Sequence, residues 1–482
     1  MSELSEPNAT RKKTWILNAF AMNQPSYVAP GLWRHPRNQN ARYNEINYWI
    51  ELAKLLEGNF HAIFLADVLG PYDIYKGPRN FTSVLAGAAQ FPVSDPSLVI
   101  SAMAAVTKTL SFGLTASTTY EAPYALARRF ATLDHLTNGR IAWNVVTSYL
   151  DSAAKSFGLK QEIPHDERYA IADEFLEVTY KLLEGSWRDD AVIKDETTRQ
   201  YTHADRVRRI DHEGKYFRVS GPHLVEPSRQ RTPFIFQAGA SKAGKAFATK
   251  HAEAMFLPGM DITLVKELVT SIRQAAVDQG RDPRTLKLIA GIHIVLAETD
   301  EEAQRKYEEY LSYADIEGSL ALFGGWTGTD LDEFPEDADL KFTGPPAMQS
   351  MVETWSETIP GSGNIKWTKA RVARELALGG AHARAVGSAK TVADILENWV
   401  DETDIDGFNI SYAIIPGDLE DHAKYLVPEL KARGVFWDPF SAEGKTTREI
   451  FLGEDVAPNG RLSSDHPGAQ FKWNTDTEAR SQ

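Results

Sequence analysis

One segment of the sequence has the residue types and spacing of a phosphate-binding loop. Residues 239–246 read Gly-Ala-Ser-Lys-Ala-Gly-Lys-Ala, follow an apolar run and open an amphipathic one, which nearly matches the P-loop pattern. The match fails at Ala246, where a P-loop carries the Ser or Thr that ligates magnesium. Free backbone N–H groups at a helix start still predict an anion site, at Gly239, Ala240 and Ser241. The alternative is an ordinary tight turn with Ser241 as the N-cap.

Polar side chains also end two other apolar runs. Residues 141–148 read Ile-Ala-Trp-Asn-Val-Val-Thr-Ser, so Asn144 and Thr147 stand where a barrel strand would deliver them to a ligand. Asp67 ends the run Phe-Leu-Ala-Asp and is either a turn residue or a hydrogen-bond acceptor in the same site. These strand ends predict a ligand site without identifying the ligand.

The segment His165-Asp-Glu-Arg-Tyr169 opens a further amphipathic run. It is either a charged helix start with Tyr169 packed in the core, or it offers donors from His165 and Tyr169 to a phosphate across the mouth of a barrel. Glycoside hydrolysis would require two carboxylates at strand ends. The fourth and seventh apolar runs carry Asn144 and His293 instead, which weakens that alternative.

Composition and charge exclude several classes of protein. A formal net charge of −14 argues against broad nucleic-acid binding, and the absence of cysteine excludes disulfides and thiolate catalysis. The sequence has no G-x-G-x-x-G fingerprint and no two histidines four residues apart, so neither a dinucleotide fold nor a metal site is predicted. Residues 1–13 are polar, and no run approaches the roughly 18 apolar residues of a membrane span. We therefore expect a cytoplasmic protein without a membrane segment.

Strand-like and helix-like runs alternate along the chain. The strand-like runs are 15–21, 62–68, 110–119, 141–148, 233–238, 252–257, 286–296 and 407–413. The helix-like runs are 43–57, 96–108, 123–136, 166–183, 243–251, 261–279, 299–313 and 389–401. Eight such units predict an α/β fold of the (β/α)8 TIM-barrel type rather than an open doubly wound sheet.

Three long stretches, after strands 2, 4 and 7, interrupt this repeat and are predicted to be lids or pocket walls, because the βα loops of a barrel form its site. They span about 69–95, 185–231 and 314–370, the second with a hairpin at 210–219. The barrel is predicted to be a single domain over 14–440. The polar segment 1–13 precedes it, and a tail, 441–482, is predicted to wrap the surface or a neighbouring molecule.

Six ordered motifs together resemble those of the bacterial-luciferase-like flavin monooxygenases. They are Trp33–Pro36, Phe64–Asp67, Thr118–Tyr120, Leu133–Ser148, His165–Tyr169 and Phe236–Ser241. The resemblance covers about residues 14–440 and is nearest to the branch with nitrilotriacetate, EDTA, dibenzothiophene-sulfone and dimethylsulfide monooxygenases. Residues 66–75 and 324–328 look most like the members that oxidise dimethylsulfide.

The resemblance implies a luciferase-like TIM barrel that binds reduced FMN (FMNH2), supplied by a separate NAD(P)H:flavin reductase. It also implies O2 as co-substrate, a flavin C4a-peroxide as oxidant, and a homodimer or homotetramer. The cofactor-binding residues that it implies are Asp67, Thr118, Asn144, Thr147, His165, Tyr169, Gly239, Ala240 and Ser241. The segment Ser241-Lys-Ala-Gly244 departs from the Ser-Pro-Arg-Gly of many relatives, so a bidentate arginine is missing at the phosphate.

For the second molecule in the site, we expect the apolar pocket walls to be Phe20, Trp33, Phe64 and Trp326. His35 and His293 are candidate catalytic residues that would contact the peroxide or the substrate. A small organosulfur compound such as dimethylsulfide is the expected substrate, and an aminopolycarboxylate, an alkane or a sulfone is the alternative on the same fold. Outside the family, the alternatives are a phosphate-binding barrel hydrolase or NTPase, and a noncatalytic flavin-binding protein.

Overall fold

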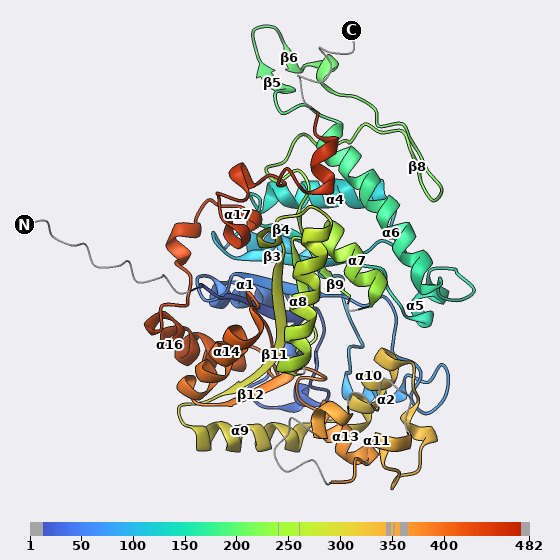
Figure 1. Cartoon of the computed structure of the whole chain (residues 1–482), viewed down its shortest axis with the longest axis vertical. Helices are drawn as coiled ribbons and strands as arrows, with labels where there is room; N and C mark the ends of the chain where they lie inside the picture. Colours follow the sequence, from blue (N-terminus) through green and yellow to red (C-terminus); the bar gives the residue numbers. More distant parts are fainter. Residues whose placement is uncertain are drawn as a thin grey trace, which may run out of the picture.

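Eight parallel strands close into a barrel in the computed structural model, which describes residues 13–239, 241–259, 261–343, 349, 352–356 and 365–473 (Figure 1). In order around the barrel they are β1 (Ile16–Met22), β2 (Ala62–Ala66), β3 (Ser111–Ser117), β4 (Ile141–Val146), β9 (Phe234–Ala238), β10 (Ala254–Leu257), β11 (Lys287–Leu296) and β13 (Gly407–Ser411). The ring closes because β13 pairs with β1 and β10 pairs with β11. The predicted (β/α)8 barrel is confirmed, and each strand falls within a predicted run or ends within a residue of it.

Amphipathic helices connect the strands and bury one face each. They are α1 (Ile46–Leu56), α3 (Ser97–Ala104), α4 (Pro123–Leu136), α6 (His165–Tyr180), α7 (Lys242–His251), α8 (Ile262–Asp278), α9 (Asp300–Tyr313) and α14 (Ala389–Thr403). In α8, for example, Val265, Val269, Ile272 and Ala276 recur at helical spacing and are buried. None of the helices in the described part of the chain is both long and apolar enough to cross a membrane.

The amino-terminal half of the barrel interior is filled by aromatic rings. Phe64, Phe236 and Phe256 lie within 5.6 Å of one another, measured between ring centroids. Gly113 on β3 faces these rings, and a Cβ there would lie 2.8 Å from Phe64, so only glycine fits. The interior of the barrel is therefore a packed core at these rings, and the predicted site lies at the carboxyl ends of the strands.

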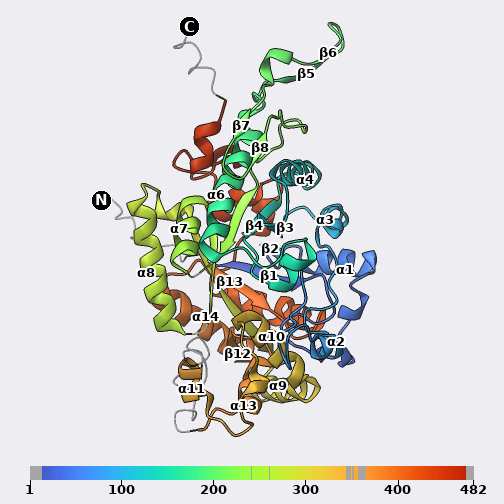
Figure 2. The same cartoon turned by 90° about the vertical axis from the view of Figure 1, so that its right-hand side faces the viewer.

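The three insertions contain regular elements of their own. The first holds α2 (Thr82–Gly87), and the second holds two hairpins, β5 (Val192–Asp195) with β6 (Gln200–Thr202) and β7 (His212–Glu213) with β8 (Arg218–Val219). The β7–β8 pair lies within the hairpin predicted at 210–219. The third holds α10 (Ile316–Thr327) and α11 (Leu340–Thr343), and α13 (Lys369–Leu376) begins at its end. The β5–β6 hairpin projects from the body of the molecule (Figure 2), whereas the β7–β8 turn packs on α6, where the Phe217 and Phe175 ring centroids are 5.5 Å apart.

The structure also contains a strand and several short helices that are not among the predicted runs. Strand β12 (Ala383–Gly387) pairs with the second half of β11 outside the barrel ring. The further short helices are α5 (Asp151–Ser156), α15 (Gly417–Asp421), α16 (Val427–Ala432) and α17 (Thr447–Leu452).

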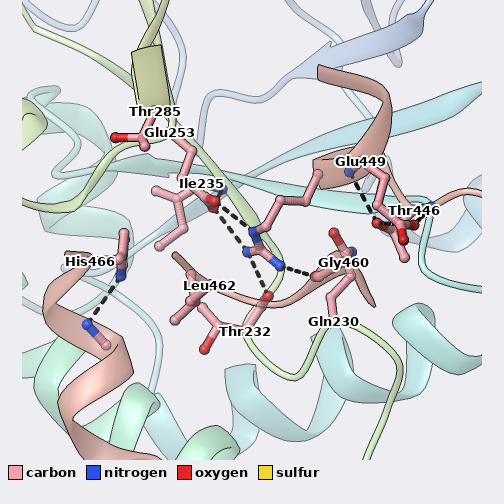
Figure 3. A network of polar contacts seen from close by, with 12 residues as sticks. Gln230, Thr232, Ile235, Glu253, Thr285, Thr446, Glu449, Gly460, Leu462 and His466 are labelled. Carbon is pink, nitrogen blue, oxygen red and sulfur yellow. Dashed lines mark hydrogen bonds and ion pairs between the residues drawn. The ribbon is translucent and has the colours of Figure 1, made fainter. Parts of the chain in front are cut away.

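The carboxyl-terminal segment packs on the barrel of its own chain, at the amino-terminal end of the strands. Phe451 of α17 lies against Phe234 and Phe236, with centroid distances of 5.1 and 5.6 Å. The guanidinium of Arg448, which is 0% exposed on its side chain, donates to Glu253 at 2.6 and 2.9 Å and to the backbone carbonyls of Thr232 and Gly460 (Figure 3). This segment therefore closes the end of the barrel opposite the predicted site.

Candidate active site

A cavity of about 400 Å³ lies at the carboxyl ends of β2, β4 and β9. Six of the nine residues expected to bind the cofactor line it, namely Asp67, Thr147, His165, Tyr169, Gly239 and Ser241. These residues come from four separate segments of the chain, so the barrel topology brings them together. Ala240 lies outside the described residues.

Several possible hydrogen-bond donors gather at one end of this cavity. Ser241 caps α7, its Oγ accepting a hydrogen bond from the Gly244 amide at 3.0 Å and lying 3.3 Å from His165 Nε2. The Tyr169 hydroxyl lies against the same turn: a Cβ on Gly239 would come within 2.9 Å of it, and one on Gly244 within 2.8 Å. The amino terminus of a helix, a hydroxyl and an imidazole therefore converge where a phosphate would fit.

The other end of the cavity is mostly apolar, with Val68, Leu69, Val146 and Leu150 in its walls and Asp67 beside them. Burial, reinforced by the nearby Asp95, raises the pKa of Asp67 to about 7. Near neutral pH this carboxyl is thus partly protonated and able to donate a hydrogen bond to a ring.

A second cavity, of about 490 Å³, adjoins the first and shares Asp67, Val68, Leu69, Val146 and Ser148 with it. Its wall contains the ion pair between Glu121 and Arg129. Burial raises the pKa of Glu121 as well. Asp67 therefore stands at the boundary of two cavities, in an environment that disfavours carboxylate charge.

A third cavity, of about 940 Å³, shares Tyr149, Leu150 and Arg168 with the first. In its wall the Tyr72 hydroxyl lies 3.3 Å from that of Tyr149 and accepts a hydrogen bond from Trp326 Nε1 at 3.2 Å. The same hydroxyl donates to Gln90 Oε1 at 3.1 Å. This cluster of hydroxyl, amide and indole groups lies next to the flavin-sized cavity, and a substrate would meet it there.

Of the four residues in this cluster, the sequence predicts only Trp326 as a pocket wall, and not Tyr72, Gln90 or Tyr149. Tyr149 directly follows the polar end of β4, so its position in a βα loop was the available signal. Tyr72 and Gln90 lie at the two ends of the first insertion, and no local pattern distinguishes them from its other polar residues.

Two expected cofactor residues lie beside the cavity rather than in its lining. Asn144 points into the barrel, where its Nδ2 donates to Thr115 Oγ1 at 2.9 Å, and its Oδ1 is buried without a partner. Thr118 is buried at the end of β3 and hydrogen-bonds through Oγ1 to the Val146 carbonyl at 3.3 Å. The Oδ1 of Asn144 is therefore available as a hydrogen-bond acceptor.

The structure separates the remaining predicted residues. Trp33 is 42% exposed, and the His35 ring packs between Tyr310 and Tyr313 with its Nε2 3.3 Å from Glu309. Neither Trp33 nor His35 is among the residues that line the three cavities.

Two other predicted residues lie within the barrel, where Phe20 packs on Phe64 with 5.2 Å between the ring centroids. His293 is fully buried and hydrogen-bonded through Nδ1 to Ser411 Oγ at 3.0 Å. Burial lowers the pKa of His293 to about 3, so its ring is neutral, and its Nε2 has no partner.

The anion end and the apolar end together fit FMN. The phosphate would lie against Ser241, His165 and Tyr169, and the ring between the apolar walls near Asp67. Among the described residues, no group of three or more His, Asp or Glu side chains is arranged to hold a metal ion. The near-P-loop segment thus forms an N-capped helix start without the hydroxyl ligand of a magnesium nucleotide site.

Comparison with known proteins agrees with this geometry. The family model described as luciferase-like monooxygenase matches residues 26–404. The chain belongs to the luciferase-like monooxygenase family. It is accordingly a flavin-dependent oxidoreductase, and the hydrolase, NTPase and noncatalytic alternatives are excluded.

Two curated members of the luciferase-like monooxygenase family are almost equally similar to the chain. A dimethyl-sulfide monooxygenase of Hyphomicrobium sulfonivorans is 46% identical over 462 residues, covering 96% of this chain and 94% of the relative. A long-chain alkane monooxygenase of Geobacillus thermodenitrificans is 47% identical over 457 residues, covering 95% and 97%. The crystal structure of DmoA from Hyphomicrobium sulfonivorans matches with a TM-score of 0.89 at 44% identity, covering 96% of this chain and 98% of that one. Identity alone therefore does not separate a small sulfide from a long alkane as substrate.

Proposed function

We propose that this luciferase-like monooxygenase is the oxygenase component of a two-component system that oxidises a small organosulfur compound such as dimethylsulfide. Its cofactor would be FMNH2, delivered by a separate NAD(P)H:flavin reductase, and its co-substrate O2. A nitrilotriacetate monooxygenase of Aminobacter aminovorans, 33% identical over 437 residues, is described as component A, which supports a partner that supplies the flavin.

Reduced FMN, when bound, supplies the two electrons with which one oxygen atom of O2 enters the substrate while the other leaves as water. The protein's own residues would bind the cofactor, orient it and shield it from water. Ser241, His165 and Tyr169 would hold the phosphate, and the apolar walls would keep water from the ring. The Tyr72 hydroxyl is held by three hydrogen-bond partners, and it would fix the neighbouring Tyr149 hydroxyl at the edge of the site.

The observation that carries the choice of substrate is the wall of the third cavity. Its aromatic side chains Tyr72, Tyr149 and Trp326 suit an apolar molecule. The charged side chains in the wall of this cavity have an excess of negative charge. They are the five carboxylates Asp73, Asp151, Glu162, Asp330 and Glu333 and the three cations Arg79, Lys155 and Arg168. An aminopolycarboxylate would be repelled there, so an uncharged sulfide or alkane is favoured.

Turnover with purified protein, FMN, NADH and a flavin reductase from another source tests this function. We expect O2-dependent oxidation of dimethylsulfide that requires the reductase, and little turnover of hexadecane or nitrilotriacetate. Product analysis by gas chromatography is the measurement, and omission of the reductase is the control. Oxidation of hexadecane with dimethylsulfide untouched would assign the protein to the alkane alternative.

Asp67 gives a prediction about pH. Its carboxyl is mostly neutral below its pKa of about 7 and mostly charged above it, and the negative form would lie beside a phosphate-bearing, anionic ligand. FMN affinity should therefore fall as the pH rises from 6.5 to 8.5, and Asp67→Asn should remove that fall. Fluorescence titration of FMN measures it, with the distant Asp278→Asn as control. A wild-type affinity that does not change over this interval would contradict the assignment of Asp67 to the ring.

We also propose that the protein is a homodimer or homotetramer. The β5–β6 hairpin projects from the body of the chain, and its two strands pair with each other and not with the barrel sheet (Figure 2). A two-stranded hairpin of this kind is marginally stable by itself in water, which supports a packing partner in an assembly. Light scattering coupled to size-exclusion chromatography measures the mass and would contradict this proposal if it gave that of a single chain.

A further inference from the structure

Trp326 stands in the wall of the third cavity, in the last turn of α10. Its indole is packed against two hydrophobic clusters, that of the barrel and that of the third insertion. Gly380 faces the ring from the other side, where a Cβ would lie 2.9 Å from Cη2. The ring is thus held between a helix and a backbone turn, with little freedom to move.

Tyr72 is held in the same way by the residue next to Trp326. A Cβ on Gly325 would overlap the Tyr72 ring, so α10 lies directly on this ring through a bare backbone. The Tyr72 hydroxyl then receives the indole N–H of Trp326 at 3.2 Å. Gly325 and Gly380 therefore allow two large rings to lie in contact with backbone, and the hydrogen bond between Tyr72 and Trp326 fixes their relative position.

The pair Tyr72–Trp326, which we call the clamp, also fixes the positions of Gln90 and Tyr149. Tyr72 donates to Gln90, and Gln90 in turn donates through Nε2 to the Tyr27 carbonyl at 3.4 Å. Tyr149, which lines both the first and the third cavity, completes the cluster at 3.3 Å from Tyr72. A substrate that reaches the flavin from the third cavity would pass the edge of the clamp, where the Trp326 ring fills space that a longer molecule would occupy.

We propose that Trp326 is a specificity-determining residue that limits the length of the alkyl chain admitted beside Tyr72, and so restricts this site to small dialkyl sulfides. The inference rests on the proposed function and extends it, because it names the residue that separates a small sulfide from a long chain. Replacing the ring by a methyl group leaves an apolar space, and an apolar cavity of about 150 Å³ in a protein stays dry and accepts a ligand of benzene's size. Each added methylene in such a pocket changes the specificity constant by about 10- to 200-fold.

The test is a series of dialkyl sulfides from dimethyl to dihexyl, assayed with wild type, Trp326→Ala and Trp326→Phe. For Trp326→Ala, kcat/KM for dihexyl sulfide relative to dimethyl sulfide should rise by about tenfold or more. Trp326→Phe keeps most of the ring and lacks the N–H donor, so its profile should stay close to that of wild type. Phe440→Ala, which removes an 89% exposed aromatic ring at the other end of the barrel, is the matched control and should leave the profile unchanged.

A length profile of Trp326→Ala that parallels that of wild type would overturn the inference. Binding gives a second readout that does not depend on turnover: calorimetric titration of the same sulfides into protein saturated with oxidised FMN. Dihexyl sulfide should bind Trp326→Ala about tenfold more tightly than wild type, and equal affinities would also overturn it. If wild type oxidises none of the sulfides, the proposed substrate is wrong, while the binding series still decides the role of Trp326.

Discussion

Replacing Arg448 with alanine is expected to lower the free energy of unfolding by about 3–5 kcal/mol, the typical cost of removing one partner of a buried ion pair. The guanidinium is fully buried and donates to both oxygens of Glu253, which is itself only 2% exposed (Figure 3). Without it, the Glu253 carboxylate would keep only backbone N–H partners such as that of Ile235, at 3.1 Å. Urea unfolding followed by circular dichroism measures the change.

Two further variants separate the ion pair from a general effect of losing an arginine. Arg284 is 71% exposed on its side chain and paired with Asp282, so Arg284→Ala should lower the free energy of unfolding far less than Arg448→Ala does. The double variant Arg448→Met/Glu253→Leu leaves no unpaired charge and should be more stable than Arg448→Ala. A single variant as stable as wild type would show that α17 contributes little to the stability of the barrel.

Much of the barrel was predictable because its signals are local. Each strand is a short apolar run with its own boundaries, and each connecting helix, such as α8, repeats apolar residues at helical spacing. Helix α10 was not predicted, since Gly324 and Gly325 read as loop residues. The need for glycine at position 325 comes from the tertiary structure. A side chain at Gly325 would overlap Tyr72, which lies about 250 residues earlier in the chain. The tail was predicted only to wrap a surface, because the Arg448–Glu253 contact joins residues 195 positions apart.

The same distinction holds for the candidate site. The N-capped turn was predictable, because a glycine turn before a helix has a recognisable sequence and Ser241 is its N-cap. The cluster around Tyr72 was not, since its members come from three of the loops that follow strands and from no single motif. His35 was chosen for its place in a loop after β1, yet its ring is packed between two tyrosines. Residue type and strand order thus indicate which loops form a site, while long-range packing decides which side chains enter it.

Gly244→Ala is expected to weaken FMN binding by roughly a hundredfold. A Cβ at this position would lie 2.8 Å from the Tyr169 hydroxyl and 2.9 Å from the Gly239 carbonyl, both too close, so the hydroxyl and the turn must move. If the phosphate loses two hydrogen bonds, each worth about 1.5–3 kcal/mol to a charged group, the affinity falls by at least this factor. Fluorescence titration with oxidised FMN is the measurement.

The fold itself should tolerate Gly244→Ala, because alanine is a better helix former than glycine by about 1 kcal/mol and the position lies in the first turn of α7. Thermal unfolding of the flavin-free protein is therefore expected to change little, which separates a damaged site from a damaged fold. Tyr169→Phe removes the hydroxyl that the new methyl group would meet, so the two changes act on the same contact. The double variant should then bind FMN no more weakly than Gly244→Ala, since the losses overlap. Two outcomes would show that the phosphate does not lie against this turn. One is a double variant whose loss of FMN affinity equals the sum of the two single losses, and the other is a Gly244→Ala variant with wild-type affinity.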